Sequence, residues 1–428
     1  MTDISPPTDL PGLAARRAAL DLFAAALARR TGIDEAVSRP GFGALSPRDR
    51  AFAQALALAT LRRLGAIDRA LDAKLTKPPP EMVVHILRLG VAQAFVLGTP
   101  AYAAVGASVD LAASIRESKP FKGLVNAVLR GLTREPPDLD DPETLAPAWL
   151  FARWSAAYGA EAARAIAAEI AFEPETDLTP KDPDQSPPAE LAVDLIPGGS
   201  WRSRLRGDVA AWAGFDAGLW WVQDASAAVP ARLLGASAGQ TVLDLCAAPG
   251  GKTLQLAATG AAVTALDRSA PRLKRVSENL ARMGLAAEIV VADAAEWPAE
   301  REFDAVLLDA PCSATGTFRR NPDVLWAARP GEIATLAGVQ SRLLDAAARS
   351  VRSGGRLVYC VCSLETEEGE AQIQGFLARR PDFHLEAMSS GEGGAPAASL
   401  RPDGTLRILP HHREGGTDGF YVARFRRA

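Results

Sequence analysis

The first third of the chain shows the apolar spacing of amphipathic helices almost throughout. Apolar residues recur three and four positions apart, with arginines between them, and three consecutive prolines at 78–80 interrupt the pattern once. The segments with this spacing are residues 14–30, 50–75, 81–98, 101–115 and 121–135. We therefore predict an all-helical bundle, a pattern that suits a docking, a dimerisation or an RNA-binding module equally well.

From Gln240 onward, short apolar runs alternate with helical patterns. The strand-like runs are residues 241–246, 261–267, 287–293, 303–311 and 355–363, and helical spacing is clearest over 271–284 and 333–351. Buried strands separated by helices predict an α/β fold, with an open and mostly parallel Rossmann-like sheet covered on both faces. In such sheets, ligands bind beyond the carboxyl ends of the strands.

The segments between these two patterns are mixed. Residues 136–145 are acidic and proline-rich and predict a linker, residues 151–171 have helical spacing, and residues 179–188 are loop-like. Further on, Arg202, Arg204 and Arg206 lie close in sequence to several tryptophans. Arginine beside aromatic residues suits base stacking and phosphate pairing, and it suits an ordinary domain interface about as well.

We divide the chain into four parts on this basis. They are a helical domain at 1–135, a linker at 136–145, an ancillary RNA-binding region at 146–235 and a catalytic domain at 236–428.

Composition and charge narrow the class of protein. The 428 residues are 48% hydrophobic and 23% charged, and no stretch resembles an export signal or a membrane span, so we expect a cytoplasmic protein without a membrane partner. The net charge is −4, yet residues 1–135 carry 18 Lys and Arg against 12 Asp and Glu. A basic front part gives weak support to nucleic-acid binding. Nothing in the sequence indicates an oligomeric state.

All four cysteines lie in the second half, and each falls at the end of a strand-like run: Cys246, Cys312, Cys360 and Cys362. Structural disulfides are not expected in the cytosol. No pair has the spacing of a zinc knuckle, because a single residue separates Cys360 from Cys362, so we expect no metal site. Four thiols at one edge of a sheet indicate chemistry more than packing.

The run from Phe303 ends in Asp309, a proline and Cys312. A carboxylate that ends a buried strand must be paired, hydrogen-bonded or turned toward a ligand. A turn that caps a helix is the simpler interpretation of this stretch taken alone.

The ends of the first three strands predict a cofactor site. A glycine-bearing loop between a strand and a helix lets a ligand approach the backbone, an acid ending the second strand suits ribose hydroxyls, and a further acid suits an adenine amino group. The loop lies in the stretch LDLCAAPGGKT, and the acids at the strand ends are Asp267 and Asp293.

Two other nucleotide motifs fit this loop poorly. A phosphate-binding P-loop would need glycine at position 246, where the chain has Cys246, and Pro249 stiffens the loop; a G-x-G-x-x-G fingerprint is absent. S-adenosylmethionine is the remaining candidate.

Cys312 and Cys362 end the fourth and fifth strands, which we expect to be neighbours. Carbon 5 of cytosine is a poor nucleophile until a thiol adds at carbon 6, after which carbon 5 can accept a methyl group while an acid such as Asp309 assists at ring nitrogen 3. A second thiol can then help to remove the carbon 5 proton and release the base.

Several stretches together resemble the RNA 5-methylcytosine methyltransferases of the RsmB/Fmu/Sun branch. They are LDLCAAPGGKT, LLDAPCSATGTFRRNPDVLW, YCVCSLETEEGE, VQDASA with Gln223, and ILPHHREGGTDGFY. The helical front part, ending in GLVNAVLRGL, is similar to the NusB-like domain of that branch. The resemblance implies ribosomal RNA as partner, with small-subunit RNA as the expected substrate, and S-adenosylmethionine as cofactor.

By position, the resemblance implies Cys362 as nucleophile and Cys312 as the product-release cysteine. It implies cofactor contacts at Cys246, Ala247, Ala248, Pro249, Gly250, Gly251 and Lys252, and at Asp267, Asp293 and Asp309. The chain departs from the pattern at Val361, where threonine is usual, at Gly369, where asparagine is usual, and at the extra thiol Cys360. The segment TDLTPK also replaces a usual arginine-valine-asparagine element. Two alternatives stay open: a transfer-RNA methyltransferase that uses the same site, and a non-catalytic RNA-binding assembly factor.

Overall fold

The computed structural model describes residues 12–28, 32–298 and 301–428. The chain forms two compact units, one from Met1–Phe172 with Asn321–Ala327 and one from Glu173–Arg320 with Ala328–Ala428. The α/β class predicted for the chain is confirmed, with an all-helical part and a mixed sheet covered by helices.

The first unit is helical, as the apolar spacing predicted. Its α-helices are α1 (Leu13–Leu27), α2 (Gly32–Val37), α3 (Pro40–Gly43), α4 (Pro47–Arg62), α5 (Leu64–Asp72), α6 (Glu81–Phe95), α7 (Ala101–Ser114), α8 (Lys122–Arg134), α9 (Pro142–Leu145), α10 (Ala148–Tyr158), α11 (Ala160–Ala168) and α15 (Asp323–Ala327). The segment 50–75 with continuous helical spacing forms two helices, because the backbone leaves the helical region at Arg63 (φ −120°, ψ 19°). Ser46 caps α4, its Oγ accepting from the Asp49 amide at 3.1 Å.

The acidic segment that the sequence predicted to be a linker is fastened to these helices. Arg63 pairs with Asp140 at 2.9 Å and Arg69 with Asp141 at 3.0 Å. Asp141 also caps α9, and the compact unit continues to Phe172. Residues 136–145 therefore belong to the same unit as the helices before them, while the division of functions among the predicted domains stays a prediction.

The second unit is built on a mixed sheet with the strand order β10-β12-β9-β8-β5-β6-β7, to which β11 is added beside β12. The strands are β5 (Thr241–Leu245), β6 (Ala262–Asp267), β7 (Glu288–Val291), β8 (Phe303–Asp309), β9 (Val351–Val361), β10 (Phe383–Leu385), β11 (Leu406–Ile408) and β12 (Phe420–Arg427). The five predicted runs form the parallel strands β5 to β9. The chain reverses its direction of travel across the sheet between β5 and β8, so the switch point lies between these two strands.

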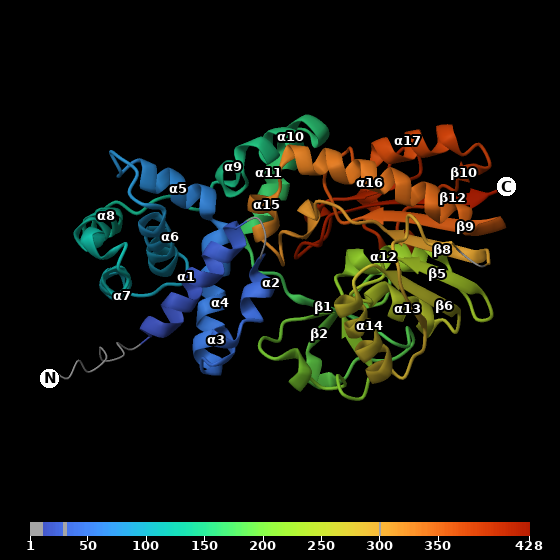
Figure 1. The fold of residues 1–428 in the computed structure, drawn as a ribbon, viewed down its shortest axis with the longest axis horizontal. Coiled ribbons are helices and arrows are strands. Elements are labelled where there is room, and N and C mark those ends of the chain that lie inside the picture. The colour runs from blue at the N-terminus through green and yellow to red at the C-terminus, as the bar shows by residue number, and fades with distance from the viewer. Residues whose placement is uncertain (1–11, 29–31, 299–300) are drawn as a thin grey trace. The chain divides into compact units, whose positions relative to one another are not determined.

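Helices cover both faces of this sheet, as Figure 1 shows. One face carries α12 (Ala225–Leu234), α13 (Gly251–Ala258) and α14 (Ala270–Met283), and the other carries α16 (Pro330–Arg349) and α17 (Glu370–Arg379). Successive side chains of β8 alternate between the two cores: Ala305 and Leu307 pack on the α12–α14 side, and Val306 and Leu308 on the α16–α17 side. Burial on both faces explains the continuous apolar runs.

A smaller antiparallel sheet precedes the large one, with the strand order β2-β3-β1-β4. Its strands are β1 (Thr176–Pro180), β2 (Val193–Ile196), β3 (Ser200–Ser203) and β4 (Trp220–Val222). Trp201 and Trp220 lie in its core with Leu178 and Leu191. The sequence predicted none of these strands, and the stacking of bases on these two tryptophans is excluded by their burial.

Arg202, which the sequence offered as a phosphate ligand, is buried in the second unit. Its Nε and Nη2 donate to the carboxylate of Asp177 at 2.7 and 2.9 Å, and its guanidinium also reaches the carbonyls of Glu414 and Gly416. Burial outweighs the guanidinium and raises the pKa of Asp177. Arg204, by contrast, has a side chain that is 69% exposed and pairs with Glu175 and Asp194.

Every helix in the described part of the chain is too short or too polar to span a lipid bilayer.

We expect the Arg202→Ala variant to lose about 3–5 kcal/mol of unfolding free energy, because Asp177 would be left buried without its cation. The measurement is chemical denaturation followed by circular dichroism. Arg204→Ala is the matched control, and its loss should be small because exposed pairs contribute little. Equal losses for the two variants would contradict the assigned structural role of Arg202.

Candidate active site

The predicted thiol loops meet at the carboxyl edge of the large sheet. β8 and β9 pair in parallel, with Asp309 opposite Cys360, so the segments that follow the two strands leave the sheet side by side. The sulfur atoms of Cys312 and Cys362 lie 3.5 Å apart. The expectation that these strands are neighbours is confirmed.

Asp309 lies next to these thiols and is held by two side chains. Lys252 Nζ donates to Oδ2 at 2.7 Å and Cys360 Sγ to Oδ1 at 3.4 Å. Burial alone would lower the pKa of Lys252, but the charge of Asp309 outweighs it and the pKa is raised, so the ammonium persists. The Lys252 ammonium also lies 5.3 Å from the centre of the Phe420 ring.

The role of the extra thiol, Cys360, follows from the same contacts. Its side chain is fully buried, and burial followed by the charge of Asp309 raises its pKa well above the usual value. A neutral thiol that donates to a carboxylate is a supporting group, because nucleophilic attack needs a thiolate.

The loop between β5 and α13 has an irregular backbone. Cys246 has a positive φ of 61°, the Ala248–Pro249 peptide is cis, and Gly250 has a φ of 107°. A Cβ on Gly250 would lie 3.1 Å from Val276, so both the backbone angle and the space favour glycine there. Cys246 packs toward the α16–α17 face, and burial raises the pKa of its thiol to about 12.

The two acids assigned to an adenosyl group differ in environment. Asp267 is buried, and its carboxylate accepts from the backbone amides of Ala248 at 3.2 Å and Ser269 at 2.9 Å. Asp293 is exposed and accepts from the amide of Ala295 at 2.8 Å. Asp267 therefore shapes the cofactor loop, whether or not it also contacts a ribose, and the cofactor contacts of both acids stay predictions.

A cavity of about 460 Å³ lies within the second unit at this edge of the sheet. The predicted site residues in its wall are Ala247, Pro249, Gly250, Gly251, Lys252, Asp309 and Cys362. Its lining does not include five others: Cys246, Ala248, Asp267, Asp293 and Cys312. The wall also contains Gln223, Asp244, Asn279, Arg320 and Phe420, of which the sequence had singled out only Gln223.

Asp244 provides a test of whether this cavity suits an adenosyl cofactor. Its side chain is fully buried, Oδ2 accepts from Thr253 Oγ1 at 2.6 Å, and Oδ1 has no partner among the described residues. Burial raises the pKa of Asp244 to about 7. An unpaired acceptor beside a glycine-lined loop fits a ligand that carries a hydrogen-bond donor, as the adenosyl group does.

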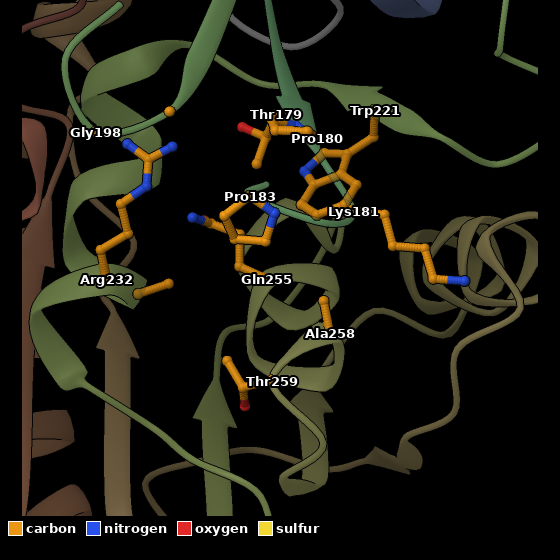
Figure 2. A pocket seen from close by; sticks show the side chains of 12 residues that line it. Thr179, Pro180, Lys181, Pro183, Gly198, Trp221, Arg232, Gln255, Ala258 and Thr259 are labelled. Atoms are coloured by element: carbon orange, nitrogen blue, oxygen red, sulfur yellow. The ribbon is translucent and has the colours of Figure 1, made fainter. Parts of the chain in front are cut away.

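A second cavity has a volume of about 210 Å³ and is lined by Arg232 from α12, Thr179 from β1 and Gln255 from α13. Figure 2 shows these side chains around it. None of the predicted site residues lines it. Trp221 contributes to both cavities, and its Nε1 donates to Gln223, whose Nε2 donates to Gln255 at 2.7 Å. Gln223 is thereby held against Gly251, where an added Cβ would lie 3.3 Å from its amide carbon.

The sequence did not predict a buried network of hydrogen bonds and ion pairs that reaches the wall of the larger cavity. Asp224 caps α12 through the amide of Ser226 at 2.8 Å and accepts from the amide of Asp418 at 3.2 Å. Arg320 pairs with Asp418. Burial raises the pKa of Asp418 to about 6, whereas Arg320 and Arg319 outweigh burial at Asp224 and lower its pKa.

The departure at Gly369 also has a structural reason. A Cβ at this position would lie 2.3 Å from Arg407 Nη2 and 2.9 Å from Tyr421. Arg407 is buried, donates to Glu370 at 2.6 Å and to the carbonyl of Ser363 at 2.5 Å, and so fills the space that an asparagine would need.

Comparisons with known proteins agree with this geometry. The family model "16S rRNA methyltransferase RsmB/F" matches residues 231–426, and the NusB family model matches residues 13–134. Ribosomal RNA small subunit methyltransferase B of Sodalis glossinidius is 36% identical over 417 residues, which cover 89% of this chain and 90% of that protein. This chain belongs to the RsmB/F methyltransferase family.

Two solved structures extend the comparison to the fold. The structure named PH0851 is 25% identical with a TM-score of 0.77 and covers 98% of this chain and 99% of its own. NSun6 from Pyrococcus horikoshii with SFG is 21% identical with a TM-score of 0.56, covers 66% of this chain and 98% of its own, and shares the fold. The resemblance drawn from the motifs is confirmed: the protein is an RsmB/F-type methyltransferase with a NusB-like domain, and its cofactor is S-adenosylmethionine.

The described residues contain no group of three or more His, Cys, Asp or Glu side chains arranged to hold a metal ion.

We expect Asp244→Asn to change the pH dependence of stability. Because the folded pKa of about 7 lies above the usual value near 4, the stability contributed by Asp244 is complete below pH 4 and is lost as pH rises through 7. Asparagine keeps an acceptor for Thr253 without the charge. The melting temperature of the variant minus that of the wild type should therefore rise between pH 4.5 and 8.5, and a difference that stays flat would refute the assignment.

Proposed function

We propose that this RsmB/F-family protein methylates carbon 5 of a cytosine in small-subunit ribosomal RNA through a covalent adduct. The observation that carries the proposal is the sulfur–sulfur distance of 3.5 Å between Cys312 and Cys362, next to the Asp309 carboxylate. The family description and the name of the Sodalis relative support the choice of RNA. A cytoplasmic location, where ribosomal RNA is assembled in bacteria, belongs to the same proposal.

Cys362 is the proposed nucleophile, since it lies in the wall of the cavity that also contains the cofactor loop. Its thiolate forms a bond to carbon 6, and the ring electrons move toward nitrogen 3. Asp309, which takes up a proton when the RNA binds, passes that proton to nitrogen 3 and returns to the carboxylate form. Lys252, 2.7 Å from Asp309, compensates the carboxylate after that proton is given up. Carbon 5 of the adduct is now nucleophilic.

S-adenosylmethionine supplies an electrophilic methyl group on its sulfonium. The residues proposed to hold it are the loop from Cys246 to Lys252, with Asp267 and Asp293 at the strand ends, and Asp309 beside the reacting edge. Gly250 and Gly251 lie in the wall of the larger cavity, and Asp267 keeps the loop in shape through the Ala248 amide.

Cys312 is proposed to act in product release. The hydrogen bond shared with Cys362, together with burial, raises the pKa of the Cys312 thiol, so its thiolate is a strong base once formed. It accepts the proton of carbon 5, the C–H electron pair restores the ring double bond, and the bond between Cys362 and carbon 6 breaks with its electrons returning to sulfur. Nitrogen 3 returns its proton to Asp309, so the released base is neutral. Both thiols are then back in their starting chemical form after a proton exchange with solvent.

We expect Cys362→Ala to abolish methylation, with a loss well beyond the roughly hundredfold effect of removing an acid–base helper. Cys312→Ala should still form the adduct and release it poorly, so that a protein–RNA band survives denaturing electrophoresis. The assay uses tritiated cofactor and unmodified ribosomal RNA. A trapped band with Cys362→Ala instead would reverse the two roles.

Bisulfite sequencing of RNA from a deletion strain, complemented with the wild type or with Cys362→Ala, identifies the substrate. A cytosine in small-subunit RNA should be methylated only with the wild type. A mark that appears in transfer RNA instead would favour the transfer-RNA alternative, and no mark in any RNA would favour the assembly factor.

The helical unit is proposed to hold the RNA while the target base is turned out of its stack. Arg116, Lys119 and Lys122 are exposed and lie within seven residues of each other, with one acid, Glu117, between them. This cluster offers several cations to the phosphates of one RNA segment.

We expect substitution of Arg116, Lys119 and Lys122 by glutamine to weaken RNA binding and to flatten its salt dependence. Each lost phosphate contact lowers the log–log slope by roughly 0.7–0.9. Salt-titrated filter binding measures the slope, and calorimetry with S-adenosylmethionine should show unchanged cofactor affinity. Lys74→Gln, which removes a cation paired with Glu135, is the control. An unchanged slope in the triple variant would deny this surface a role on RNA.

A further inference from the structure

A buried carboxylate lies behind the two reactive thiols. Glu368 is fully buried, and its oxygens accept four hydrogen bonds. Oε1 accepts from the backbone amide of Ser313 at 2.9 Å and from Gln340 Nε2 at 3.0 Å, while Oε2 accepts from the hydroxyls of Ser313 and Ser363, both at 2.5 Å. All four partners donate, which is the pattern that an ionised carboxyl group requires.

These partners come from the segments that carry the thiols. Ser313 directly follows Cys312, and Ser363 directly follows Cys362. Glu368 therefore joins the two segments at the residue next to each sulfur, although 50 residues separate them in sequence. The serine hydroxyls also lie 3.1 Å from each other.

Further contacts keep this carboxylate in place. The hydroxyl of Tyr359 donates to the backbone carbonyl of Glu368 at 2.6 Å, and Gln340 Nε2 also donates to the carbonyl of Pro311 at 2.9 Å. Arg407 donates to the carbonyl of Ser363 from the other side. The charged or titratable groups around the carboxylate are thus Tyr359, Arg407, Cys312 and Cys362, with Glu365 close by through Thr315.

Among the described residues, the four donors to the carboxylate oxygens of Glu368 are neutral groups, so dipoles rather than an ion pair compensate its charge. Burying a charge without an ion-pair partner is costly, so packing alone is a poor reason for a glutamate at this position. A functional demand accounts better for its presence. The reaction supplies one: carbons 5 and 6 are adjacent ring atoms, so the two sulfur atoms must be held a few ångströms apart.

We propose that Glu368 is a positioning residue that fixes Cys312 relative to Cys362 for the release of the methylated base. The inference rests on the proposed function. The attack on carbon 6 requires only the sulfur of Cys362. Release of the base requires the sulfurs of Cys362 and Cys312 to be held at the correct separation. Loss of Glu368 should therefore act mainly on release, and the charge of Glu368 also contributes to the raised pKa of Cys312, which strengthens its thiolate as a base.

Three variants of Glu368 separate its geometry from its charge. Glu368→Ala removes every link, Glu368→Gln retains the side-chain length and an acceptor for the Ser313 amide while its NH₂ can donate to the serine hydroxyls, and Glu368→Asp retains the charge but is one methylene shorter. If Glu368 has a positioning role, the Glu368→Gln variant should release product within a few-fold of the wild type. The Glu368→Ala and Glu368→Asp variants should release product on the order of a hundredfold more slowly and accumulate adduct. Glu386→Gln, a half-buried carboxylate held by Arg356, is the matched control and should behave as wild type.

A second readout does not depend on methylation. Thiols 3.5 Å apart should form a Cys312–Cys362 disulfide readily with diamide, and mass spectrometry of the full-length protein measures its yield against time. Glu368→Ala and Glu368→Asp should form it several-fold more slowly than the wild type and Glu368→Gln. Because this test needs neither RNA nor cofactor, it stands even if the proposed reaction fails.

Wild-type release and wild-type disulfide formation in a folded Glu368→Ala variant would overturn the inference. Normal product release by Glu368→Asp together with slow release by Glu368→Gln would also overturn the inference, because the charge of the side chain alone would then matter. If Glu368→Ala does not fold, the double variant Ser313→Ala/Ser363→Ala removes both hydroxyl links with the backbone contact kept, and the same two measurements apply with the same expected directions.

Discussion

The register between β8 and β9 is the constraint on which the site depends. Parallel pairing of Asp309 with Cys360 brings the end of one strand level with the end of the other, and the loops that follow are then forced to share the space beyond the sheet. Side chains alternate along a strand, so a slip of one residue would turn Asp309 away from Lys252 and place Cys360 in the opposite core. The two cores prevent that slip, because Ala305 and Leu307 pack on one face while Val306 and Leu308 pack on the other.

Two carboxylates flank the thiols, and their environments differ. Asp309 has a lysine ammonium at 2.7 Å and opens to the cavity, so its charge can be compensated while it exchanges a proton with a ligand. Glu368 has four neutral donors and is fully buried, so its hydrogen-bonding pattern is satisfied without any ligand. The first environment suits chemistry and the second suits support.

Much of the site could be predicted from the sequence, because the predicted strands end in cysteine, in aspartate or in both. The parallel strands were predictable because strands buried on both faces are continuously apolar. β12 was not, because its arginines interrupt the apolar pattern. Arg424 is buried, and its Nη atoms donate to Glu392 and to backbone carbonyls, which no local pattern reveals. β1 escaped prediction because it includes Pro180 and borders a loop-like segment. Contacts between residues that are far apart in the sequence could not be predicted either. They include the ion pair of Lys252 with Asp309 and the hydrogen bond of Glu368 with Ser313.

The arginine and tryptophan region illustrates how one local pattern supports opposite interpretations. Arg202 is not a phosphate ligand but a tie between the small sheet and the segment 414–416 near the C-terminus. Its partner Asp177 also accepts from the amide of Ala225, at the start of the helix that Asp224 caps, and Asp224 in turn holds the backbone of Asp418. Asp418 pairs with Arg320 in the cavity wall. A continuous chain of buried polar contacts thus runs from the small sheet to the cavity, which explains why charged residues lie in a region that a purely apolar core could have filled. The small sheet is therefore part of the architecture of the active site, whatever contacts its exposed arginines make with RNA.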